Sequence, residues 1–156
     1  MSLTWGLLAF LVVAIAASFA ARAARRALAA GLIGEINESL TLLENHDLEA
    51  ALAHCAEGGR APNLPALPTL SYRSDTAWMA LLGAHLARLS ASFYASAEAL
   101  QDELHGLSSE TAEAARTERV KSASQELQRT FALGDEALRS LRDIVSRRRH
   151  DVISRS

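Results

Sequence analysis

Three side chains able to bind a metal ion lie close together in the chain: His46, His54 and Cys55. Imidazole nitrogen and thiolate sulfur are the ligands that zinc prefers. On a helix, however, positions 46 and 54 are about 12 Å apart along the axis, and neighbouring residues point about 100° apart. One ion cannot be reached by all three, so we expect the end of an exposed helix here, no metal site and no cofactor.

Asp102 and His105 have the i, i+3 carboxylate–histidine spacing found in the di-metal sites of helical bundles. Those sites use the pair twice and add two further carboxylates, whereas this chain has it once, with Asp in place of Glu. The sequence also contains no glycine-rich phosphate loop, nucleophile elbow or Cys-x-x-Cys motif. We therefore expect no catalytic residues, no small-molecule substrate and no enzyme activity.

A basic cluster near the end of the chain, Arg147, Arg148 and Arg149, has the charge needed to bind phosphate groups. Cations at the C-terminal end of a helix also compensate the helix dipole without binding anything. Three interpretations remain open: a solvated helix end, a docking site for an acidic partner, or a site for nucleic acid or anionic lipid. With a net charge of −2 for the whole chain, nucleic acid is not the expected main partner.

The strongest signal in the sequence is the absence of charge from Met1 to Ala21, followed at once by Arg22, Arg25 and Arg26. About 20 apolar residues in a helix cross a hydrocarbon core of ~30 Å. We therefore expect a transmembrane anchor, with Trp5 at the outer interface. Its apolar side chains are Trp5, Leu7, Leu8, Phe10, Leu11, Val12, Val13, Ile15 and Phe19.

Two other interpretations of this segment are weaker. A cleaved signal peptide has basic residues before its apolar core, and none is present, although Ser18 to Ala21 loosely fits a cleavage site. A buried helix that is apolar on all sides is rare in so small a chain. Because arginines favour the cytoplasmic side, Arg22, Arg25 and Arg26 predict an N-terminus outside and the rest in the cytoplasm of a bacterial-type inner membrane.

The remaining residues favour an all-α fold, since Ala, Leu, Glu and Arg are abundant and β-branched residues are sparse after the anchor. We predict a transmembrane helix that continues into a small antiparallel three-helix bundle. A single cysteine is consistent with a reducing compartment. The expected segments are an anchor with its basic flank (1–26), an acidic membrane-proximal helix and a short helix (27–59), a proline-containing loop (60–75), a long helical hairpin (76–152) and a tail (153–156).

Apolar residues at helical spacing give the expected buried faces. They are Leu32, Ile36, Leu40 and Leu43 in the first helix; Trp78, Leu82, Leu86 or Leu89, Phe93, Ala97, Leu100 and Leu104 in the second; and Val120, Leu127, Phe131, Gly134, Leu138, Leu141 and Val145 in the third. We expect Asp47, Asp75 and Ser108 or Ser109 to cap helices, and Gly106 to end one.

Short connections make neighbouring helices antiparallel. This rule predicts that the second helix returns toward the membrane, that Gly106 lies near the bilayer and that the Arg147–Arg149 end lies far from it. The functional expectation is a non-enzymatic, single-pass membrane protein that contacts a protein partner or a second copy of itself. The alternative is a membrane-tethered binder of nucleic acid or anionic lipid through the C-terminal arginines.

Overall fold

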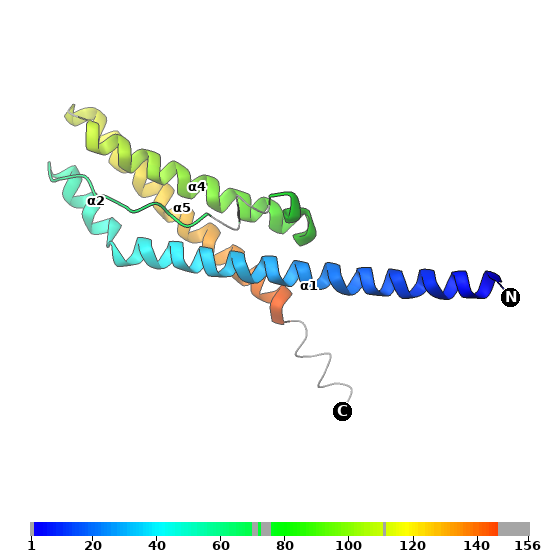
Figure 1. Ribbon diagram of the computed structural model, residues 1–156. Coiled ribbons are helices and arrows are strands. Elements are labelled where there is room, and N and C mark those ends of the chain that lie inside the picture. The colour runs from blue at the N-terminus through cyan, green and yellow to red at the C-terminus, as the bar shows by residue number, and fades with distance from the viewer. Residues whose placement is uncertain (1, 70–71, 73–75, 111, 147–156) are drawn as a thin grey trace.

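The chain folds into an elongated bundle of helices with one helix that extends far beyond the others (Figure 1). The structure, a computed structural model, describes residues 2–69, 72, 76–110 and 112–146, with the backbone alone for residues 2–9 and 76–78. Its elements are α1 (Ser2–Asn45), α2 (Leu48–Ala56), the 3-10 helix η1 (Thr76–Leu82), α4 (Ala84–Ser109) and α5 (Glu113–Ser146). The described residues contain no β-strand, so the predicted all-α bundle is confirmed.

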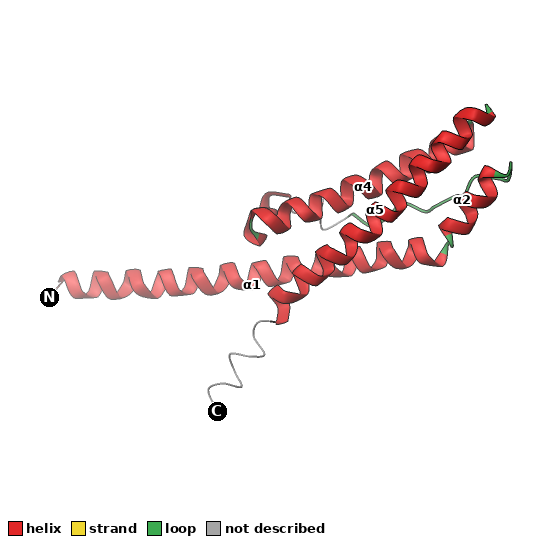
Figure 2. Ribbon diagram, turned by 180° about the vertical axis from the view of Figure 1, so that it is seen from behind, coloured by secondary structure: helices red, strands yellow, loops and turns green. Residues whose placement is uncertain are grey.

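The helix α1 has two halves with different surroundings. From Leu28 to Leu43 it places a stripe of apolar side chains in the core, and this stripe contains all four positions predicted from the sequence: Leu32, Ile36, Leu40 and Leu43. Before Arg22 the same helix stands clear of the bundle, as both ribbon views show (Figures 1 and 2). One continuous helix therefore joins a packed segment to an isolated one.

The direction of α4 relative to α1 differs from the prediction. Near the start of α4, Arg25 of α1 bonds to Leu82, and farther along Glu35 bonds to Tyr94, so the two helices run parallel. The linker between α2 and η1, residues 57–75, is the reason. At about 3.1 Å per residue an extended chain of this length spans more than 50 Å, whereas the 26 residues of α4 span about 39 Å.

The linker uses its length to return along the bundle before α4 begins (Figure 1). Pro62, Pro65 and Pro68 disfavour helix in this segment. Leu67 is buried, and the carbonyl of Pro65 accepts a hydrogen bond from Gln101 Nε2 at 3.3 Å. The proline segment is thus an extended strap packed on α4, and the rule for short connections does not apply to it.

The hairpin of α4 and α5 is antiparallel, as predicted, but its helix boundaries differ. The expected helix from Thr76 is interrupted at Gly83, whose φ of 89° is accessible mainly to glycine, and α4 begins only after it. At the other end α4 continues through Gly106. The hydroxyls of Ser108 and Ser109 donate to carbonyls one turn back, of His105 and Gly106, and so belong to the last turn of α4 rather than to a cap of α5.

Of the two other predicted caps, only the one at Asp47 is tested by the structure, and it is not found. Asp47 precedes α2 in a left-handed conformation, with φ 42°, but its side chain makes no capping hydrogen bond. The αL geometry directs the chain through the sharp turn between α1 and α2 instead, a role that Asp tolerates better than most residues. Asp75 lies outside the described residues.

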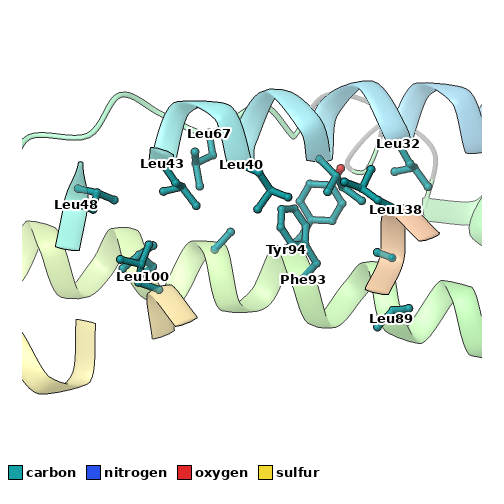
Figure 3. Close-up of a cluster of buried hydrophobic side chains, with 14 of the residues drawn as sticks. Leu32, Leu40, Leu43, Leu48, Leu67, Leu89, Phe93, Tyr94, Leu100 and Leu138 are labelled. Atoms are coloured by element: carbon teal, nitrogen blue, oxygen red, sulfur yellow. The ribbon is translucent and has the colours of Figure 1, made fainter. Parts of the chain in front are cut away.

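The core runs along the contact of α1, α4 and α5 (Figure 3). Of the predicted stripe of α5, Phe131 is half-buried and Val145 is 43% exposed because it lies in the last turn of the helix; the side chain of Trp78 is not described. The other predicted positions are buried: Leu82, Leu86, Leu89, Phe93, Ala97, Leu100 and Leu104, and then Val120, Leu127, Gly134, Leu138 and Leu141.

Gly134 of α5 lies against side chains of both α1 and α4. A Cβ atom at this position would lie 2.9 Å from Leu40 Cδ2 of α1 and 3.1 Å from Phe93 Cε2 of α4. These distances are shorter than ordinary van der Waals contact, so glycine is what allows Leu40 and Phe93 to pack over α5. The glycine that interrupts the coiled-coil pattern in the sequence is therefore a packing residue of the bundle.

Two polar contacts are enclosed in this apolar core. Tyr94 of α4 donates a hydrogen bond to Glu35 Oε2 of α1 at 2.9 Å, and Tyr72 of the linker stacks on Tyr94 with ring centroids 4.2 Å apart. Between α4 and α5, Ser96 donates to Glu126 Oε2 at 2.8 Å and lies 3.0 Å from the hydroxyl of Thr130. Each pair fixes the register of two helices, because a shift would leave buried polar atoms without partners.

The Tyr94 hydroxyl is expected to make folding sensitive to alkaline pH. Burial raises its pKa, and the hydrogen bond to Glu35 and the Glu35 charge raise it further. The unfolded chain then releases this proton near pH 10 while the folded chain keeps it, so stability is complete below pH 10 and falls above it, by about 1.4 kcal/mol at pH 11.

Urea unfolding of the full chain in detergent at pH 8 and pH 11 measures this effect. The Tyr94→Phe variant is expected to be about 1 kcal/mol less stable at pH 8 and to lose less stability than the wild type between the two pH values. Tyr72→Phe is the matched control. An equal loss in wild type and Tyr94→Phe would show that Tyr94 does not carry the alkaline sensitivity.

Candidate functional site

The half of α1 that stands clear of the bundle is covered by large apolar side chains with no protein around them. Phe10 is 74% exposed and Phe19 is 61% exposed, and the residues between them include Leu11, Val12, Val13 and Ile15, all exposed. The side chains of Trp5, Leu7 and Leu8 are not described. A contiguous apolar surface of this kind marks a contact with a membrane or another macromolecule.

Among the residues whose placement is described, no helix is both long enough and apolar enough to cross a bilayer.

Arg22, Arg25 and Arg26 lie on α1 where the exposed half meets the bundle. Their i, i+3, i+4 spacing places them on one face of the helix. They line a cleft of about 390 Å³ that is completed by His85 and Leu86 of α4 and by Ser140, Asp143 and Ile144 of α5. All three helices of the bundle therefore contribute to this cleft, which we call the basic cleft.

Specific contacts hold the walls of the basic cleft in place. Arg25 donates a hydrogen bond from Nη2 to the carbonyl oxygen of Leu82 at 3.2 Å, which links α1 to the last turn of η1. His85 lies in the first turn of α4, and Gly83 before it offers no side chain to cap that end. The first amide groups of a helix carry a partial positive charge, which adds to that of the arginines.

The charge in the basic cleft is unbalanced. Its lining contains three arginines and one carboxylate, Asp143. Within the described part of the chain, no ion pair joins Arg22 or Arg26 to an acidic side chain, although Arg119, Lys121 and Arg129 each have such a partner. Guanidinium groups bind phosphate and carboxylate oxygens through paired N–H donors. The arrangement is therefore suited to hold an anion.

The residues considered for metal binding are not brought together. His46 and His54 are exposed on α1–α2, whereas Cys55 is fully buried in the core. No group of three His, Cys, Asp or Glu side chains that could hold a metal occurs among the residues with described positions. Asp102 and His105 are exposed and line a shallow groove of about 630 Å³ between α4 and the linker.

Arg147, Arg148 and Arg149 lie outside the described residues, but the end of α5 contradicts the expected geometry. Asp143 and Ile144 line the basic cleft together with Arg22 at the start of the packed part of α1. The last turns of α5 are thus at the end of the bundle next to the exposed half of α1, and the last turn of α4, which contains Gly106, is at the opposite end (Figure 1). The prediction had these two ends reversed, because it assumed that α1 and α4 are antiparallel.

Comparison of the chain with protein-family models, with curated proteins and with solved structures finds no match.

Sequence reasoning identified the arginines but not the cleft. Arg22, Arg25 and Arg26 were visible as the basic flank of an apolar run. His85 and Asp143 reach the same place only because α4 starts at this end of the bundle and α5 finishes there. No local pattern around either residue indicates this, so it depends on the path of the linker.

Proposed function

We propose that this chain is a single-pass membrane protein. In this proposal the exposed half of α1 lies in the lipid bilayer and the bundle is held at the cytoplasmic face of a bacterial-type inner membrane. The observation that carries the proposal is the exposed apolar helix that precedes Arg22. Phe10, Val13 and Phe19 make no contact with the bundle core, and leaving such side chains in water costs about 25 cal/mol per Å².

Length and charge support this proposal. The uncharged run from Met1 to Ala21 is about 30 Å long as a helix, which is the thickness of a bilayer's hydrocarbon core. The arginines that follow it are placed where their side chains can reach the headgroups. A helix is also the only conformation in which a single segment satisfies its backbone hydrogen bonds in lipid.

The role that we propose for the bundle is to contact another protein or a second copy of this chain. Its three helices are joined by apolar packing and by polar contacts such as Tyr94 with Glu35 and Ser96 with Glu126. A membrane-held, non-enzymatic assembly protein fits these features better than an enzyme does.

The alternative function is binding of nucleic acid or anionic lipid through the C-terminal arginines, which lie outside the described residues. The described part of α5 ends at Ser146, and its last turns line the basic cleft. In the proposed orientation this end of α5 is the one nearer the membrane, which supports a lipid as the ligand of this alternative.

Topology reporters fused after Ser156 test the proposal. We expect the chain to stay in the membrane pellet after carbonate extraction, with a fluorescent-protein fusion active and an alkaline phosphatase fusion inactive. Arginines on the trailing side of a single apolar helix resist translocation, so this orientation is expected. A fusion chain of residues 22–156 that lacks the apolar run is the control. Release by carbonate, or an active phosphatase fusion, would contradict the proposed anchoring or its orientation.

A further inference from the structure

We propose that the basic cleft is a binding site for the phosphate headgroup of an anionic phospholipid. The inference rests on the proposed membrane anchoring and adds a ligand to it. Its basis is that Arg22, Arg25 and Arg26 line one cleft with His85 and Asp143, at the level where the apolar part of α1 ends.

The level of the cleft along α1 matches that of lipid phosphates. If Met1 to Ala21 fills the hydrocarbon core, Arg22 to Arg26 occupy the next ~7 Å of helix, at about 1.5 Å per residue. That interval falls in the polar headgroup layer of a bilayer. Basic side chains at this depth attract anionic lipids electrostatically.

The shape of the cleft distinguishes it from a plain basic flank. Arginines that only set orientation need no partners on other helices, whereas here α4 and α5 supply the opposite walls. Arg25 is also held by its bond to the Leu82 carbonyl, so part of the ordering of its side chain is completed before a ligand binds. A preformed, net positive pocket can hold one headgroup in one position.

A shallow, open groove on the surface of α1 alone meets the basic cleft at Arg22. It is formed by Ala14, Ile15, Ser18 and Phe19, and Arg22 closes it at the end nearer the bundle. Arg22 therefore lines both the groove and the basic cleft. This arrangement suits a molecule with a charged head and an apolar chain, and it favours a lipid over free phosphate or a nucleic acid, neither of which has an apolar chain to place.

Native mass spectrometry of the full chain in detergent, with added lipid, tests the inference. Phosphatidylglycerol has a net negative phosphate, and phosphatidylcholine has the same phosphate with a compensating choline. We expect phosphatidylglycerol to bind about fivefold more tightly. Arg25→Gln with Arg26→Gln is expected to weaken phosphatidylglycerol binding about tenfold, and Asp143→Asn to strengthen it about threefold by removing the cleft's carboxylate.

Matched variants keep the experiment specific. Lys121→Gln with Arg129→Gln also removes two cations, from exposed positions outside the cleft, and Asp135→Asn removes an exposed carboxylate elsewhere on α5. Neither is expected to change lipid binding. Circular dichroism of each variant reports whether the bundle remains folded.

Several outcomes would overturn the inference. The first two are equal affinity for the two lipids and an equal loss of phosphatidylglycerol affinity in the cleft variants and the control variants. The other two concern the ligand: displacement of phosphatidylglycerol by inorganic phosphate, or binding of an oligonucleotide that depends on Arg25 and Arg26. Insertion into pure phosphatidylcholine vesicles reports on the anchor alone. If the chain inserts there but shows no preference for phosphatidylglycerol, only the proposed lipid site in the cleft is contradicted. If the chain does not insert, both the proposed anchor and the proposed lipid site are contradicted.

Discussion

Two aspartates in the exposed half of α1, Leu11→Asp and Ile15→Asp, are expected to move the protein from the membrane fraction to the soluble fraction. A charged residue at the centre of a membrane helix costs about 2.5–3.5 kcal/mol, so two of them cost about 6 kcal/mol. The native run is rich in alanine, and each large apolar residue contributes only about 0.3–0.6 kcal/mol to insertion. Fractionation after carbonate extraction measures the change.

The same helix provides a matched control. Ala30 and Thr41 are exposed positions in the packed half of α1, so Ala30→Asp with Thr41→Asp adds the same charge to the bundle surface. This control is expected to remain in the membrane fraction. The helicity of both double variants should equal that of the wild type, because Leu11 and Ile15 do not contact the core. A Leu11 and Ile15 variant that stays in the pellet would show that this half of α1 does not enter lipid.

The buried faces of the helices were predictable because they depend on local spacing. Apolar residues recur every three or four positions in α1, at Leu32, Ile36, Leu40 and Leu43. This pattern alone predicts that one face of the helix is buried. The same reasoning found Phe93 and Leu141. It does not state which helix covers which face, since any apolar stripe can pack against any other.

The direction of α4 was not predictable, because the composition of a linker does not show whether the chain turns back at once or first returns along the bundle. A tight connection forces an antiparallel turn, whereas an extended one can return along the bundle and start the next helix parallel to the first. Pro62, Pro65 and Pro68 made an extended linker recognisable. Whether it packs along α4 depends on contacts such as Leu67 in the core and Gln101 on Pro65, which are separated from each other in the sequence.

The parallel direction of α4 relative to α1, in place of the predicted antiparallel one, has a direct consequence for the candidate site. In an antiparallel arrangement, the end of α4 that contains Gly106 would lie beside the arginines of α1, and His85 and Asp143 would lie at the opposite end of the bundle. In the observed arrangement His85 and Asp143 line the same cleft as Arg22 and its neighbours. The linker therefore determines which residues of α4 and α5 surround the arginines.

The largest effect on stability is expected from a charge in the apolar core of the bundle. Leu141 of α5 is fully buried in the core cluster. Leu141→Asp removes an apolar side chain and buries a carboxylate without a partner, which together cost more than about 4 kcal/mol. Small domains are stable by only about 5–15 kcal/mol, so the melting temperature of the full chain in detergent should fall by more than about 10 °C, as measured by circular dichroism.

Val145 is the matched control for this substitution, since it lies one turn farther along the same predicted stripe but is 43% exposed. Val145→Asp is expected to change the free energy of unfolding by less than about 0.5 kcal/mol. Both variants should remain in the membrane fraction, because neither alters the exposed half of α1. The Leu141 and Leu11 variants thus separate folding of the bundle from anchoring. Equal melting temperatures for Leu141→Asp and Val145→Asp would contradict the packing of α5 against α1 and α4.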